Sequence, residues 1–346
     1  MLHRKRTRPA APPGRLNPFF LIGLWLSVVV VGLPAAGGRE PGSTGAESLP
    51  GQAAPSRELF PVTLIDDAGV EVTVERPPGR IISLTSFTDE ILLELVELGR
   101  LVGVTVFSED PDISNVAERA RAVEHKLELN VEIVLALRPD LVLVANWSDA
   151  SEVAQLRNAG VPVFLIATGV TVGEIQSKIR TVARLVGEVE RGQEMIREME
   201  ARLAEVSRRV STLPADSRLS VMDYTTWGSS QGRGSSWDEI VRRAGLINAV
   251  AEQVADDWGQ VALSKEMILQ LDPDLLILPG WVYGNPQGAQ SFYESIVKDP
   301  ALQNLRAVRR GQVYRMPEAL RAATSQYTAE AVEYLARLAY PERWED

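Results

Sequence analysis

The pattern of apolar and polar residues changes along the chain, from strict alternation to short apolar runs. On either side of Asp66-Asp67-Ala68-Gly69, residues 62–65 and 70–74 alternate at period two, which predicts a β-hairpin. Apolar runs typical of buried strands follow at 81–84, 101–105, 141–145 and 161–166, and helical patterns lie between them at 89–98, 131–137 and 151–158. Such alternation predicts an α/β fold, with a parallel or mixed sheet covered by helices.

Two helical stretches separate this region from a second one. Residues 171–186 and 188–210 carry apolar side chains at helical spacing, and Gly187 is expected to break them apart. The second helix, about 35 Å long, can cross a small protein. Strand and helix alternation then resumes beyond Pro214. We therefore predict two α/β lobes, residues 58–170 and 213–346, joined by a long backbone helix within residues 171–212.

A repeated string indicates that the two lobes share one architecture. Residues 132–141 read EIVLALRPDL and residues 266–275 read EMILQLDPDL, and each predicts a helix, a Pro-Asp turn and an apolar strand. Pro-Asp after a helix is also ordinary turn chemistry, because proline stops a helix and aspartate tolerates turn geometry. Two matches offset by 134 residues nevertheless favour duplication.

The amino end has the order of an export signal. Five basic residues precede a 15-residue apolar run at 19–33, which Pro34-Ala35-Ala36-Gly37 closes. As a helix this run would rise about 22 Å, less than the roughly 30 Å of a bilayer core, so cleavage is the first interpretation and an uncleaved anchor the second. We assign residues 1–36 to this signal or anchor and residues 37–57, rich in Gly, Pro and Ser, to a flexible linker. The bulk of the chain is then expected at the periplasmic or extracellular face of the membrane.

Composition excludes several classes of function. The chain has no cysteine, which rules out disulfides, thiolate metal ligands and lipid attachment through cysteine. Without residues 1–36 it carries 31 basic and 46 acidic residues, and this net charge of −15 repels nucleic acid. Two histidines, His3 and His125, are too few for a zinc site. No glycine-rich phosphate-binding motif is present, so we expect neither a metal site nor a cofactor.

One motif suggests an enzyme, and it fails a simple requirement. Residues 228–232 read GSSQG, which fits the G-x-S-x-G pattern and follows an expected strand at 219–222. A serine nucleophile in this motif needs a histidine later in the chain, and none follows. We therefore expect no catalysis.

Aromatic residues follow the expected strands of both regions. Ligands of open α/β sheets bind beyond the carboxyl ends of the strands, where these loops fall. Aromatic side chains in such loops suit a large, flat or apolar ligand better than a small ion, although each of them could instead cap a core. The residues are Trp147, Tyr224, Trp227, Trp281 and Tyr283, with Trp258 from a loop before the helix at Ser264.

Several further segments are informative through their order and spacing. They are 78–84 (PGRIISL), 88–92 (TDEIL), 101–104 (LVGV), both Pro-Asp-Leu units, 236–240 (SWDEI), 244–249 (AGLINA) and 307–314 (AVRRGQVY). Over residues 62–342 the chain thereby resembles the helix-linked extracytoplasmic binding proteins of ABC importers for iron-siderophore and cobalamin. The resemblance implies a monomer that binds a metal chelate in a ligand cleft between the lobes. The chelate is either a ferric siderophore or a corrinoid such as cobalamin, and the protein delivers it to ABC permease subunits. The alternative is a membrane-tethered ligand sensor or scaffold with the same fold.

The resemblance also assigns roles to individual residues. Ligand contacts come from the loop after the first strand, from aromatics such as Trp147 and Trp227, and from basic residues that suit the carboxylates of chelators. The loop residues are Thr85, Ser86 and Phe87, and the basic candidates are Arg233 and Arg321, for which a surface position is the alternative.

Docking onto permease arginines is assigned, by the same resemblance, to acidic residues. Glu90 matches the first of them by position. Ile247 stands where many relatives place the second, which leaves Glu239 as the candidate substitute or as a solvated helix residue. For His125 two roles remain possible: it contacts a metal held by the chelator, or it has no ligand role.

Overall fold

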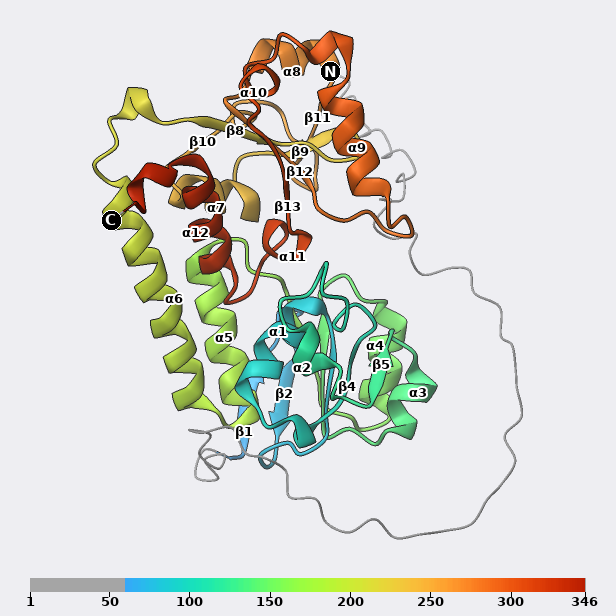
Figure 1. Ribbon diagram of the computed structural model, residues 1–346. Coiled ribbons are helices and arrows are strands. Elements are labelled where there is room, and N and C mark those ends of the chain that lie inside the picture. The colour runs from blue at the N-terminus through green and yellow to red at the C-terminus, as the bar shows by residue number, and fades with distance from the viewer. Residues whose placement is uncertain (1–59, 346) are drawn as a thin grey trace, which may run out of the picture. The chain divides into compact units, whose positions relative to one another are not determined.

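The structure, a computed structural model, describes residues 60–345 (Figure 1). The predicted export signal at 1–36 and linker at 37–57 lie outside the described residues. No helix within residues 60–345 combines the length and the apolar character that crossing a membrane requires.

The first lobe is built on a five-stranded sheet in which every neighbouring pair is parallel. Its strand order is β5-β4-β3-β6-β7, and an antiparallel hairpin of β1 and β2 precedes it. The central strands β3 and β6 are buried along their whole length, as expected for a sheet covered on both faces. The strands are β1 (Val62–Ile65), β2 (Glu71–Val74), β3 (Ile81–Leu84), β4 (Leu101–Thr105), β5 (His125–Leu127), β6 (Leu141–Ala145) and β7 (Val163–Ile166), and the helices are α1 (Ser86–Leu95), α2 (Ala117–Ala120), α3 (Val131–Ala136) and α4 (Ala150–Asn158).

Two long helices follow, and they lie side by side (Figure 1). A capping box starts α5 (Val172–Val186): Thr171 accepts a hydrogen bond from the backbone of Glu174, whose side chain accepts one in return. Gly187 ends the helix in the left-handed conformation, with φ of 78°, that glycine adopts without steric cost. The next helix, α6 (Val189–Val210), starts two residues later. Both helices therefore match their predicted ranges closely.

The second lobe repeats the parallel arrangement with fewer strands. Its main sheet has the order β10-β8-β12-β13, all parallel, and β9 pairs with β11 in a small antiparallel sheet beside it. The strands are β8 (Ser220–Asp223), β9 (Ser229–Gln231), β10 (Ile247–Asn248), β11 (Gln260–Ala262), β12 (Leu275–Pro279) and β13 (Val313–Met316), and the helices are α7 (Ser236–Arg243), α8 (Lys265–Leu271), α9 (Gly288–Val297), α10 (Arg306–Arg309), α11 (Glu318–Arg321) and α12 (Thr328–Ala339). Short 3-10 turns occur at Leu98–Arg100, Ala215–Ser217, Pro300–Leu302 and Pro341–Arg343.

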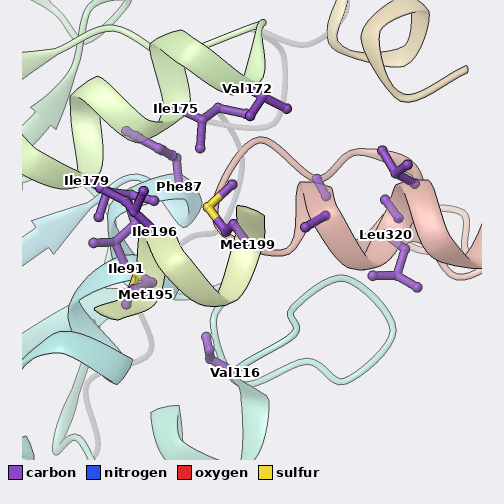
Figure 2. Close-up of a cluster of buried hydrophobic side chains, with 14 of the residues drawn as sticks. Phe87, Ile91, Val116, Val172, Ile175, Ile179, Met195, Ile196, Met199 and Leu320 are labelled. Atoms are coloured by element: carbon purple, nitrogen blue, oxygen red, sulfur yellow. The ribbon is translucent and has the colours of Figure 1, made fainter. Parts of the chain in front are cut away.

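One apolar cluster runs through both lobes. It contains side chains of the first sheet and of α1, then of α5 and α6, then of the second sheet and of α7 and α12. Figure 2 shows part of it, where Ile91 of α1 and Met195 of α6 meet near Ile179 of α5. Two smaller clusters fill the far sides of the two sheets. Since the long helices bury apolar surface against both lobes, they join the lobes through packing as well as through the chain.

The repeated string has the same geometry in both lobes. Arg138 and Asp272, at equivalent places before the proline, both have positive φ, 47° and 39°. The carboxylate of Asp140 accepts hydrogen bonds from the backbone amides of Gly79 and Arg80 at 2.9 and 2.8 Å. Asp274 accepts one from the amide of Ser220 at 3.0 Å. Each aspartate thus holds the start of the neighbouring strand, β3 or β8, and the predicted duplication is confirmed as a structural repeat.

Candidate ligand-binding site

In the first lobe, two predicted ligand loops end neighbouring strands. Leu84 of β3 pairs with Val144 of β6, so the segments that follow both strands leave the sheet at the same edge. Ser86 is exposed there at the start of α1, and Trp147 lies in the turn after β6 with 58% of its surface exposed. Thr85, which directly precedes Ser86, is the N-cap residue of α1 and is buried.

The second lobe places its aromatic residues in the corresponding loops. Tyr224 leaves β8 beside β12, and its amide donates to the carbonyl of Ile277 at 2.8 Å. Trp227 lies in a tight turn between β8 and β9, and Trp258 lies in the loop before β11, the partner strand of β9. These two side chains are 67% and 60% exposed. Two large aromatic rings are therefore exposed to solvent next to the edge of the sheet.

A pair of aromatic residues follows β12. Trp281 and Tyr283 pack edge to face, with ring centroids 5.8 Å apart. Tyr224 instead packs against Phe292 of α9 at 5.7 Å, so part of its ring belongs to the lobe's own packing. Exposed tryptophan is costly in water, and burial of such rings against a ligand is favourable. The arrangement can bind a broad apolar surface.

Phe87 differs from the prediction. It is a core residue with only 4% of its surface exposed, and it lies among Ile175, Ile179 and Met199 of α5 and α6 (Figure 2). The reason is that α1 begins at Ser86, three residues before the predicted start, so Phe87 sits in the first turn on the buried helix face. Its prediction as a ligand contact is therefore not supported by this packing.

Arg321, predicted to face an anionic ligand, is buried and already paired. Its guanidinium contacts the carboxylate of Asp223 at 3.2 Å and forms two hydrogen bonds to Glu318, at 2.8 and 2.5 Å. Burial raises the pKa of Asp223, and the positive charge of Arg321 opposes that shift. Two carboxylates thus surround one guanidinium, so this group offers no unneutralised positive charge to a ligand.

Arg233, the second basic candidate, is exposed and also paired. Its guanidinium donates to the carbonyl of Ala251 at 3.1 Å and forms an ion pair with Glu252. The pair is largely solvated, so its contribution to stability is small. Both arginines proposed for chelator binding are therefore engaged with acidic side chains of the chain itself.

The two predicted docking acids are buried instead of exposed. Glu90 is 7% exposed and Glu239 is 4% exposed. Ser325, from the link between α11 and α12, donates to the Glu90 carboxylate, and Asn115 donates at 2.7 Å. An acid that must meet a partner's arginine has to be accessible, and Glu90 is enclosed because its hydrogen-bond donors come from both lobes.

Glu239 is enclosed in a different way. Its carboxylate accepts from the amide of Val172 at 3.3 Å, at the start of α5, and pairs with Arg242 and Arg243. Burial would raise the pKa of this carboxyl, but the hydrogen bonds from Arg243 and Val172 outweigh it and lower the pKa. The anion at a helix N-terminus is also favoured by the helix dipole.

The motif that suggested an enzyme has a structural role. Ser230 is fully buried and its hydroxyl donates to Asp223 at 2.6 Å. The sequence reasoning missed Asp223, which ends β8; a lone acid closing an apolar strand was the available signal.

His125 is partly exposed on β5 and lies 3.9 Å from Glu124. Within residues 60–345 no group of three or more His, Asp or Glu side chains is arranged to hold a metal ion.

A shallow hollow is lined by residues at the opposite end of the first sheet. It is formed around Pro78, Gly79 and Arg100, which lie at the amino ends of β3 and β4. Ligands of parallel α/β sheets bind at the carboxyl ends of strands. The hollow therefore lies away from the aromatic loops and is not the candidate site.

Comparison with known proteins identifies the family. Residues 81–320 match the family described as periplasmic binding protein, and the chain belongs to this family. It is 25% identical over 335 residues to the uncharacterized ABC transporter substrate-binding lipoprotein YvrC of Bacillus subtilis, with 94% of this chain and 98% of YvrC covered. The protein is accordingly a solute-binding component of an ABC transporter.

Two further relatives bind different solutes. A cobalamin-binding protein of Halobacterium salinarum is 28% identical over 220 residues, which cover 63% of this chain and 58% of that protein. The solved structure of MolA of Haemophilus influenzae, bound to molybdate, superposes with a TM-score of 0.68 at 21% identity, covering 82% of this chain and 93% of that one. The second likeness shows the fold, the predicted two α/β lobes joined by a helix.

Proposed function

We propose that the protein captures a corrinoid such as cobalamin in a cleft between the lobes, outside the cytoplasm, and delivers it as a monomer to an ABC permease. The observation that carries this proposal is the set of exposed aromatic side chains in both lobes: Trp147 and Trp227 follow the carboxyl ends of β6 and β8, and Trp258 lies in the loop before β11. A corrinoid presents a wide, largely apolar ring, which such side chains can cover. The name of the Halobacterium relative supports the same solute class.

The state of the arginines favours a corrinoid over a ferric siderophore. Many siderophores are held through carboxylate or catecholate oxygens, which call for unpaired cationic groups. Arg321 and Arg233 are both paired with acidic residues. A solute with little net charge avoids breaking these pairs. The acidic composition of the chain points the same way, since it repels anionic chelates.

We propose in addition that residues 1–36 export the chain and that residues 37–57 tether the folded part near the membrane. The cysteine that would carry a lipid is absent, which distinguishes this sequence from the lipoprotein relative. Retention would therefore depend on the apolar segment at 19–33 remaining uncleaved. Mass determination of the protein recovered from membranes distinguishes a retained segment from a removed one.

Docking requires carboxylates that a permease can reach, and the structural repeat supplies a pair. Glu132 in the first turn of α3 and Glu266 in the first turn of α8 occupy equivalent places in the two lobes, and both are exposed. We expect the double replacement Glu132→Ala and Glu266→Ala to lower solute uptake by about tenfold, through lost ion pairs with the permease, while the ligand Kd stays within about twofold.

The docking experiment compares uptake and binding in the same variants. Uptake of labelled cobalamin is measured in cells with the importer, and Kd is measured on purified protein. The control pair is Glu97→Ala with Glu118→Ala, two exposed acids outside the repeat. Unchanged uptake in the Glu132 and Glu266 double variant would contradict their role in docking. It would not affect the proposal of which solute is carried.

Tryptophan fluorescence tests the class of solute. The protein is titrated with cyanocobalamin, haem, a ferric catecholate, a ferric hydroxamate, molybdate and free ferric ion, with correction for absorption by coloured ligands. We expect saturable quenching at submicromolar cyanocobalamin and none with molybdate. If only a siderophore gave saturable quenching, that chelate and not a corrinoid would be the proposed solute. If no compound changed the fluorescence, the proposal of an aromatic ligand site would be contradicted.

A further inference from the structure

Glu90 lies where three segments of the chain meet. Its carboxylate accepts hydrogen bonds from the side chain and the backbone of Asn115, at 2.7 and 3.2 Å, in the segment between β4 and α2. The hydroxyl of Ser325 donates to the other oxygen, and the side chain of Gln326 donates to the Glu90 carbonyl at 2.7 Å. Asn115 donates in turn to the carbonyl of Ala319 in α11 at 3.0 Å. One acid of the first lobe thus connects α1 to the α11–α12 link of the second.

No positive charge balances this acid within residues 60–345. Glu90 takes part in no ion pair there, and its acidic neighbours on α1 are Asp89 and Glu94. From the second lobe, the hydroxyl of Tyr327 donates to Glu94, and Glu330 adds a further negative charge. The cationic group on α2, Arg119, donates from Nε to the carbonyl of Leu93 at 2.6 Å, while its buried Nη2 has no hydrogen-bond partner within residues 60–345.

Neither α5 nor α11 brings a positive charge without a partner toward Glu90. The face of α5 toward α1 is apolar, with Val172, Ile175 and Ile179 (Figure 2). In α11, Arg321 pairs with Glu318 and with Asp223, so its positive charge is already shared by two carboxylates. An ionised Glu90 in this setting is a buried anion that has hydrogen bonds but no counter-ion within residues 60–345, which is costly unless it is protonated or reaches water.

We propose that Glu90 is a proton-controlled latch between the two lobes: as the neutral acid it holds the α11–α12 link against α1, and as the anion it favours release of that link into water. The inference concerns the ligand-free chain and does not depend on which solute is carried. Release would separate Ser325 and Gln326 from α1, and Asn115 from Ala319, because these contacts share the same acid.

The direction of the pH dependence follows from burial. Burial raises the pKa of Glu90 to about 7, from an ordinary value near 4.5. An acid whose pKa is raised in the closed state stabilises that state fully below the ordinary value, and this contribution is lost as pH rises to the raised value. The latch is therefore closed near pH 4.5 and weakens up to pH 7. Between these limits the ratio of released to closed link rises roughly tenfold per pH unit.

Hydrogen exchange of the ligand-free protein, followed by mass spectrometry from pH 4.5 to 8, tests the latch. Exchange rates of peptides covering 319–327 are divided by the intrinsic rate at each pH, and the buried strand β6 reports global unfolding. We expect the corrected rate of the 319–327 peptides to rise with pH up to about 7 and then level off. In Glu90→Gln, which keeps the size of the side chain and cannot ionise, the corrected rate should be independent of pH.

Asp89→Asn is the matched control. Asp89 is also buried with its pKa raised to about 7, but it accepts hydrogen bonds from Thr105 of β4 within the first lobe. This variant should keep the pH dependence of the 319–327 peptides. Ser325→Ala provides a second test if Glu90→Gln does not fold, since loss of the donor should raise exchange at every pH. Wild-type exchange without pH dependence, or the same slope in Glu90→Gln, would overturn the proposal.

Discussion

Arg321→Ala is expected to lower the free energy of unfolding by about 3–5 kcal/mol, because it leaves a buried carboxylate without its counter-ion. Asp223 is fully buried, and the guanidinium of Arg321 at 3.2 Å is its cationic partner. The hydrogen bonds that remain, from Ser230 and the amide of Gln231, do not supply positive charge. Urea unfolding of wild type and variant measures the difference.

The loss should depend on pH in a definite direction. Without Arg321 the pKa of Asp223, already raised by burial, rises further. An acid whose pKa is raised in the folded state contributes most to stability at low pH and loses that contribution as pH increases. The loss in free energy of unfolding caused by Arg321→Ala should therefore be smaller at pH 5 than at pH 8. Arg233→Ala is the control, because its exposed pair with Glu252 should contribute less than about 1 kcal/mol. If the Arg321 variant were as stable as wild type but deficient in ligand binding, Arg321 would have to be assigned to the ligand site and not to a stabilising ion pair.

Loss of Trp147 and Trp227 together is expected to weaken corrinoid binding by roughly 30- to 700-fold, or about 2–4 kcal/mol. The two rings lie on different lobes at the carboxyl ends of β6 and β8, and both are mostly exposed in the free protein. Each is available to bury its face against the ligand. Because neither side chain contributes much to the core, stability should be nearly unchanged. Calorimetric titration of both single variants and the double variant measures the effect.

Ile65→Ala serves as the control for the tryptophan variants. Ile65 is 70% exposed on the β1 hairpin, which is not one of the aromatic loops. Its replacement should leave the affinity unchanged. If the double tryptophan variant bound the corrinoid as tightly as wild type, the aromatic loops would not form the site.

The repeated architecture could be predicted from the sequence because its signals are local. The helix, the Pro-Asp turn and the strand of each copy are encoded within ten consecutive residues. The structure adds the hydrogen bonds of Asp140 and Asp274 to the starts of the neighbouring strands. The long helices could be predicted equally well, because their apolar spacing and Gly187 mark the boundaries.

The environment of individual side chains could not be predicted in the same way. Glu90 resembles an exposed helical acid in sequence, but its donor Ser325 comes from 235 residues further along the chain. Arg321 likewise pairs with Asp223 across 98 residues. Phe87 was misplaced for a local reason, since a start of α1 three residues early turns that side chain into the core. Fold followed from periodicity, whereas charge pairing required the tertiary structure.

Isothermal titration of the ligand-free protein with cyanocobalamin shows directly whether this protein binds a corrinoid. We predict one site per chain, a submicromolar Kd and a negative heat-capacity change from burial of apolar surface. The affinity should fall in the Trp147 and Trp227 double variant. Absence of measurable heat at several temperatures, together with tight binding of a ferric siderophore, would contradict the claim that this protein carries a corrinoid.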